Sequence, residues 1–140
     1  MTTEYVCGFA FNQDKTKVLL INKNRPDWQA GKLNGIGGHI EQGEAKLVAM
    51  QREFREETGI VTKFHQWIPI IGICNHTTSW KVYFFWTVTD ITKAIKTTDE
   101  EPIAIAVNDL WILRDKLVSS NLLWLIPMAL DIDVKDMFVG

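Results

Sequence analysis

The sequence predicts a single domain with an α+β fold, and two observations support this. Several short apolar runs of strand length, separated by polar turns, fill most of the chain, and only two stretches carry a helical pattern. No linker, repeat or low-complexity tract divides the 140 residues, and a chain of this length with 46% hydrophobic residues can bury one sizeable core. We therefore expect residues 1–140 to form a single domain.

The N-terminal part of the chain predicts a β-hairpin followed by a loop. Residues 4–11 and 17–22 are apolar enough for strands, and the polar segment 12–16 between them predicts a turn. Residues 23–32 are polar and contain proline and glycine, which predicts a loop. Trp28 in this loop either packs locally or covers a bound base.

The second half of the chain adds further strands and a final helix. The run 80–89 is apolar at most positions, which is typical of a central strand covered on both faces. Residues 61–74 predict one long strand, or two strands broken at Pro69. The remaining expected elements are a turn at 75–79, a polar loop at 90–102, a short strand at 103–107, a helical or turn segment at 108–115, and a helix at 122–131 capped by residues 119–121.

A helix that ends at Gly59 has two distinct faces. Its apolar stripe, which predicts contact with the core, comprises Leu47, Met50 and Phe54. Glu53, Glu56 and Glu57 share a neighbouring face, where their like charges repel one another, so a positive charge should lie among them. A hard divalent cation with oxygen ligands, such as Mg²⁺ or Mn²⁺, would supply that charge. The alternative is a solvated face on which Arg52 pairs with the glutamates.

Residues 38–60 resemble the signature of the Nudix hydrolases at every fixed position. That signature is Gly, five residues, Glu, seven residues, Arg-Glu, an apolar residue, any residue, Glu-Glu, any residue, Gly and an apolar residue. The matching positions here are Gly38, Glu44, Arg52, Glu53, Phe54, Glu56, Glu57, Gly59 and Ile60. A chance match in a chain of this length is rarer than about one in 10⁷.

The resemblance implies a fold and a metal site. The implied fold is the Nudix fold, an α/β/α sandwich with a mixed central β-sheet, in which the signature forms a loop-helix-loop. The implied metal ligands are Glu53, Glu56 and Glu57 with the backbone carbonyl of Gly37. The implied cofactor is Mg²⁺ or Mn²⁺, with two or more ions needed to offset the charge of a pyrophosphate substrate.

The resemblance also implies catalytic roles for the same segment. Arg52 would orient Glu53, and Glu53 or a loop glutamate would act as the general base. Glu44 would support the ligands or complement the helix dipole. In many relatives a glutamate from a later loop completes the metal site, and Glu100 or Glu101 is the matching candidate. The alternative for both residues is a solvated acidic loop.

Residues 32–38 look like the segment that precedes the signature in Nudix enzymes acting on oxidised purine nucleoside triphosphates. In that branch an asparagine at the place of Asn34 contacts the base. We expect Gly38 to let the backbone approach the ligand and Trp80 to offer a stacking surface, although core packing is an alternative for Trp80. The expected reaction converts a nucleoside triphosphate to the monophosphate and pyrophosphate. The alternatives are hydrolysis of a nucleotide sugar or ADP-ribose, hydrolysis of capped RNA, and a non-catalytic nucleotide sensor.

Composition restricts the partners and the compartment. A formal net charge of -2 argues against a general nucleic-acid surface, so we expect a small nucleotide as substrate. The chain has no signal-peptide pattern and no long apolar run, which predicts a cytoplasmic protein without a membrane span. Cys7 and Cys74 are expected to be buried, reduced thiols. A homodimer would be typical of the family, but the sequence shows no interface.

Overall fold

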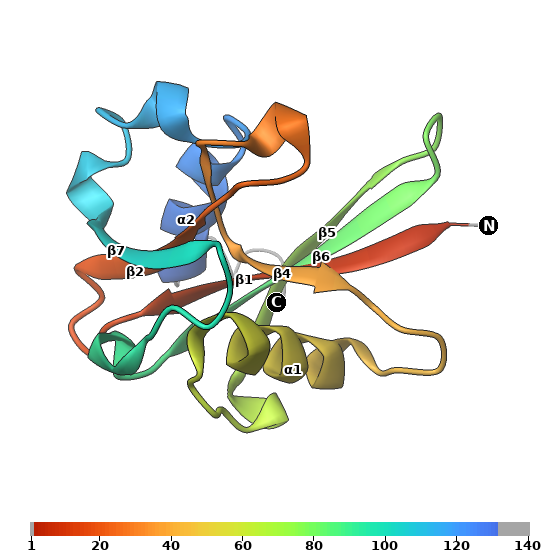
Figure 1. The fold of residues 1–140 in the computed structure, drawn as a ribbon, viewed down its shortest axis with the longest axis horizontal. Helices are drawn as coiled ribbons and strands as arrows, with labels where there is room; N and C mark the ends of the chain where they lie inside the picture. The colour runs from red at the N-terminus through yellow and green to blue at the C-terminus, as the bar shows by residue number, and fades with distance from the viewer. Residues whose placement is uncertain (1, 132–140) are drawn as a thin grey trace.

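A seven-stranded mixed sheet with a helix on each face forms the centre of the molecule (Figure 1). The computed structural model describes residues 2–131. Its strands are β1 (Thr3–Phe11), β2 (Lys17–Asn22), β3 (Leu33–Asn34), β4 (Ile36–His39), β5 (Ile68–Asn75), β6 (Trp80–Val88) and β7 (Glu101–Ala106), and its helices are α1 (Lys46–Thr58) and α2 (Leu122–Leu130). None of the helices within this range is both long enough and apolar enough to cross a membrane.

Strand β1 lies in the middle of the sheet and determines its mixed character. It runs parallel to β6 along its whole length and antiparallel to β2 and β4 on its other edge. β5 extends the sheet beyond β6, and β7 pairs antiparallel with β2. The first predicted hairpin is therefore confirmed, and so is the central place of β6.

Two apolar cores, one on each face of the sheet, make the molecule a three-layer sandwich. Alternate residues of β1 point to opposite faces, because side chains in a strand alternate. Val6 and Ala10 pack with Met50 and Phe54 of α1. The other face packs against α2, and its buried side chains include Cys7, Phe9, Phe11, Leu122, Leu125 and Ile126. The predicted α/β/α arrangement is confirmed, and Figure 1 shows the sheet between α1 and α2.

Helix α1 lies close to the sheet because β1 has a glycine beneath it. A Cβ atom at Gly8 would lie 2.6 Å from Cε of Met50 and 2.7 Å from the ring of Trp67, so any larger residue would push the helix outward. The helix ends at Gly59, whose φ of 75° is a left-handed conformation that glycine adopts without strain.

The predicted strand at 61–74 is shorter in the structure, which corrects the expectation. Residues Phe64–Gln66 form a 3₁₀ turn, and β5 begins only at Ile68. Trp67 explains the difference, because its indole Nε1 donates to Thr62 Oγ1 at 2.9 Å and its ring is buried. That contact holds the preceding segment in a compact turn. The expected break at Pro69 appears as an irregular register between Pro69 and Ile71.

Three smaller expectations are also corrected. β7 begins at Glu101 and not at 103, because Asn22 of β2 offers Glu101 a pairing partner. Cys7 is buried as predicted, but Cys74 is exposed, since it lies on the edge strand β5. Helix α2 starts at Leu122 as expected and ends at Leu130, one residue early. Within the predicted cap, the Ser119 hydroxyl accepts the Asn121 N–H at 3.4 Å, but the Asn121 side chain makes no capping bond.

Candidate active site

Arg52 is the hub of the polar network on the acidic face of α1. Its Nε and Nη2 atoms donate to the two carboxylate oxygens of Glu44 at 2.8 and 2.9 Å. Its Nη1 atom donates to Glu53 at 2.8 Å and to Glu56 at 3.3 Å, and Nη2 also donates to the carbonyl of His39 at 3.0 Å. The positive charge predicted among the carboxylates is thus a guanidinium in this structure. Arg52 joins α1 to the end of β4 and to the loop before the helix.

Glu53 lies directly against Gly38, near the end of β4. A Cβ atom at Gly38 would lie 2.6 Å from Oε1 of Glu53, so only glycine leaves room for this carboxylate. Burial raises the pKa of Glu53 above its ordinary value, and the charges of Glu56 and Glu44 add to this, while Arg52 opposes it. Glu53 is therefore a carboxylate whose proton affinity is increased and whose position is fixed.

Glu57 is the most deeply placed of the three glutamates. Its Oε2 atom is buried and has no hydrogen-bond partner among the described residues. Burial raises the pKa of Glu57 to about 8, and Glu53 and Glu100 add to this; the Lys23 ammonium and the backbone N–H of Gly37 act in the opposite direction. A buried carboxylate oxygen without a donor is costly, and a cation would stabilise it. The oxygen donors at this place therefore fit a hard divalent cation.

The described part of the chain does not gather the predicted ligands into one cluster. Between residues 2 and 131, no three His, Cys, Asp or Glu side chains are arranged so that they could hold a metal ion. The side chain of Glu56 is 57% exposed and pairs with Arg52, while Glu57 points inward. Arg52 pairs with Glu53 and Glu56, and Glu57 lies apart from both of these ion pairs. The assignment of Glu53, Glu56, Glu57 and the carbonyl of Gly37 as ligands stays a prediction.

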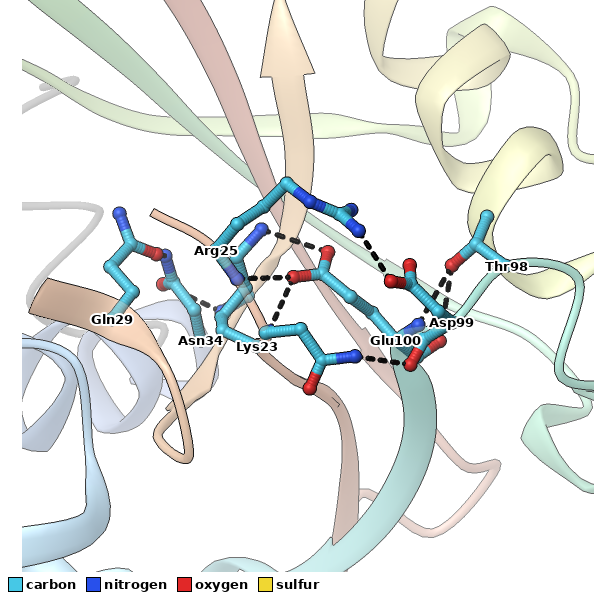
Figure 2. Close-up of polar contacts among 9 residues, drawn as sticks. Lys23, Arg25, Gln29, Asn34, Thr98, Asp99 and Glu100 are labelled. Carbon is cyan, nitrogen blue, oxygen red and sulfur yellow. Dashed lines mark hydrogen bonds and ion pairs between the residues drawn. The ribbon is translucent and has the colours of Figure 1, made fainter. Parts of the chain in front are cut away.

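Glu100 lies near the site but faces a loop. Its carboxylate accepts hydrogen bonds from Lys23 Nζ at 3.0 Å, from the Asn24 N–H at 2.6 Å and from the Arg25 N–H at 3.2 Å (Figure 2). Burial opposes its ionisation, but these donors hold its pKa below the ordinary value. Glu101 is exposed at the start of β7. Glu100 is near enough to Glu57 to raise its pKa, but among the described residues neither Glu100 nor Glu101 belongs to a group of three side chains that could hold a metal ion. The ligand role of Glu100 or Glu101 stays a prediction.

A pocket of about 630 Å³ opens between the sheet, the loop after β2 and the start of α2. The three predicted substrate-binding residues, Asn34, Gly38 and Trp80, all line it, and Gly37 does so too. Trp28 lies at its wall with 64% of its surface exposed. The three glutamates of α1 are not among its lining residues, but Gly37 and Gly38, which line it, also lie against Glu57 and Glu53. A volume of this size is in the range of small-molecule sites.

The side chain of Asn34 is held in one orientation. Its Oδ1 accepts from the Gly35 N–H at 2.8 Å, and its Nδ2 donates to Oε1 of Gln29 at 3.4 Å (Figure 2). Cys7 Sγ also lies 3.9 Å from Oδ1. The amide is therefore oriented before any ligand binds.

Sequence reasoning missed several residues that line the pocket. They include Tyr5, Gln29, Phe84, Ser119 and Asn121. Lys23, one of the basic residues that the sequence places near the cleft, does line the pocket. The residues at 119 and 121 carry no local signal, because α2 reaches the pocket only through the packing of α2 against the sheet.

Comparison with known proteins identifies the family and the fold of the chain. A family model described as NUDIX domain matches residues 1–125. A search of curated protein sequences finds no significant match. Among solved structures, a MutT from a study of Aliivibrio salmonicida and Vibrio cholerae superposes with a TM-score of 0.69 at 23% identity, covering 80% of this chain and 86% of that one.

Two further solved structures share the fold. A MutT/nudix family protein from Enterococcus faecalis has a TM-score of 0.64 at 17% identity, over 76% of this chain and 44% of that one. DR0079 from Deinococcus radiodurans has a TM-score of 0.67 at 18% identity, over 91% and 82%. At these identities the likeness establishes the fold.

Proposed function

The chain belongs to the Nudix family and is a Nudix hydrolase, and from this premise we propose that it hydrolyses a nucleoside triphosphate to the monophosphate and pyrophosphate. One observation supports the proposal above others. Gly37 and Gly38 line the pocket, and the same two residues contact Glu57 and Glu53. A base bound in the pocket would therefore extend its phosphates toward the acidic face of α1.

Divalent cations are part of this proposal. Glu53, Glu56, Glu57 and the Gly37 carbonyl would hold Mg²⁺ or Mn²⁺, since they offer only oxygen donors. The buried, partnerless oxygen of Glu57 supports this set. When bound, such ions offset phosphate charge and lower the pKa of a nearby water.

Side chains of the protein would carry out the proton transfer, the orientation of the base and the attraction of the phosphates. Glu53 would accept the proton of the attacking water as general base, and its raised pKa suits that role. Arg52 would hold the Glu53 carboxylate through its 2.8 Å hydrogen bond, and Glu44 in turn fixes Arg52. Lys23 lines the pocket and would attract the phosphate chain.

The base side of the pocket supports a purine, oxidised or not, as the first choice. Trp80 offers an aromatic face, and the oriented amide of Asn34 can both donate to and accept from a base edge. A nucleotide sugar or ADP-ribose shares the diphosphate and is the second candidate. It would place a second sugar at the open side of the pocket beside Trp28.

A hydrolysis screen tests the proposal. The full chain is incubated with Mg²⁺ and nucleoside triphosphates, oxidised nucleotides, nucleotide sugars, dinucleoside polyphosphates or capped RNA, with Glu56→Gln as the blank. The expected result is release of monophosphate and pyrophosphate from one triphosphate, dependent on Mg²⁺ and lost in the variant. Turnover of a nucleotide sugar alone would replace the proposed substrate. Nucleotide binding without turnover of any of these compounds would indicate a sensor.

A further inference from the structure

We infer that Glu100 is a positioning residue, which holds the pocket loop in place through the backbone of residues 23–25. The inference rests on the proposed function, because it assigns the loop a part in nucleotide binding. It differs from the role that the family resemblance implies, in which Glu100 would bind a metal ion. The contacts of Glu100 and the course of the loop carry the argument.

The carboxylate of Glu100 accepts hydrogen bonds from three donors at the start of the loop. One oxygen accepts from Lys23 Nζ, and the other accepts from two successive backbone N–H groups, those of Asn24 and Arg25. Only 7% of the Glu100 side chain is exposed. Both oxygens are thus engaged, and binding a cation would require Glu100 to release donors that are otherwise left without an acceptor.

Neighbouring contacts also hold residues 24 and 25 against residue 99. Asn24 Nδ2 donates to the carbonyl of Asp99 at 2.5 Å, and the Arg25 guanidinium forms an ion pair with the Asp99 carboxylate (Figure 2). Thr98 Oγ1 accepts from the Glu100 N–H at 3.1 Å, which fixes the turn that presents the carboxylate. Side chains therefore join residues 98–100 to residues 23–25 just beyond the last pair of the β2–β7 ladder, Asn22 and Glu101.

Residues 23–25, which Glu100 holds, lead directly into the pocket wall. The next residues of the loop include Pro26, Trp28 and Gln29, and these three line the pocket. The loop closes on its own base, where the Lys23 N–H donates to the Lys32 carbonyl at 2.8 Å. Displacement of residues 23–25 would therefore move the part of the pocket wall that this loop forms. It would also move Gln29, whose side chain is the hydrogen-bond partner of Asn34.

A kinetic test separates positioning from ligation. Glu100→Gln puts an amide NH₂ against the Lys23 ammonium. Glu41→Gln, the same change at an exposed glutamate outside the pocket loop, is the matched control. With the triphosphate found in the screen, we expect Glu100→Gln to raise KM about 10-fold or more, while kcat changes less than about 3-fold. The Mg²⁺ concentration for half-maximal rate should not change. A fall in kcat of about 100-fold together with a higher Mg²⁺ requirement would overturn the inference.

Hydrogen exchange on the native chain tests the same point without a variant. The amide protons of Asn24 and Arg25 should be protected, and adding Mg²⁺ alone should leave their exchange rates unchanged. Faster exchange with Mg²⁺ would mean that Glu100 leaves the loop for the cation, and absence of protection would mean that the contact does not form. Either result overturns the inference. Because this readout needs no turnover, it stands apart from failure of the hydrolysis screen.

Discussion

The guanidinium of Arg52 binds both carboxylate oxygens of Glu44, at 2.8 and 2.9 Å. Glu44 directly precedes Ala45, the residue that flanks the start of α1, and also accepts the Glu41 N–H at 3.1 Å. The pair therefore fastens the loop after β4 to the middle of the helix. Its Arg52 bonds hold the pKa of the Glu44 carboxyl below its usual range. One side chain thus fixes the loop and orients Glu53.

Replacing Arg52 by lysine should separate charge from geometry. Lysine keeps the positive charge but cannot make the forked contact with Glu44 while also holding Glu53. We expect Arg52→Lys to lower kcat at least about 10-fold and the free energy of unfolding by about 1–3 kcal/mol. Steady-state kinetics and urea unfolding measure both. Arg55→Lys, an exposed change on the same helix, is the control; equal behaviour of the two variants would contradict the hub role of Arg52.

Glu56→Gln should abolish turnover with little effect on the fold. The Glu56 side chain is 57% exposed, and its pairing with Arg52 at 3.3 Å is a weak surface contact. We expect kcat to fall by about 100-fold or more and the unfolding free energy to change by less than about 1 kcal/mol. Glu41→Gln, an exposed change outside the helix, provides the comparison. Near-normal turnover of Glu56→Gln would remove Glu56 from the proposed ligand set.

Gly38→Ala should displace a catalytic group and spare the core. The added Cβ would lie 2.6 Å from Oε1 of Glu53, so this carboxylate must move away from the sheet. We expect kcat to fall about 10-fold or more, since small displacements at a reacting group are costly. Gly72→Ala is the matched control, because its Cβ would meet the flexible end of Lys81 at 3.2 Å and the Tyr83 ring at an ordinary contact distance of 3.5 Å. The proposed role of Glu53 would be untenable if both variants kept full kcat.

Metal-free protein should lose stability as the pH rises toward about 8. Burial raises the pKa of Glu57 from 4.5 to about 8 in the folded state. The folded state therefore holds this proton to higher pH than the unfolded chain does. The resulting stability is complete below the ordinary pKa and is lost as pH rises through the folded pKa, by at most about 1.4 kcal/mol per pH unit. The pKa of Glu53 is raised too and acts in the same direction.

Urea unfolding at several pH values in the presence of a chelator measures this dependence. Glu57→Gln should flatten the curve, because its amide does not titrate. Saturating Mg²⁺ should also flatten it, since a bound cation favours the ionised carboxylate. An unchanged slope in Glu57→Gln would show that another group titrates in this range.

The sequence by itself was sufficient to predict helix α1, the β1–β2 hairpin and the family. Met50 and Phe54 recur at helical spacing and are fully buried, as the apolar stripe predicts. Gly59 ends α1 as expected from its freedom to adopt positive φ. These features depend on neighbours a few positions apart, and a local pattern therefore determines them. The proposed ligands Glu53, Glu56 and Glu57 could be named for the same reason, because their spacing belongs to one helix.

Only the tertiary structure decided which partner each of these residues has. The Asn24 N–H and the Glu100 carboxylate are 76 positions apart in the sequence, and the register of β2 with β7 brings them together. The compact turn before β5 and the exposure of Cys74 likewise depend on long-range packing and on the order of strands. Such contacts follow from how the sheet assembles, and no local pattern in the chain encodes them.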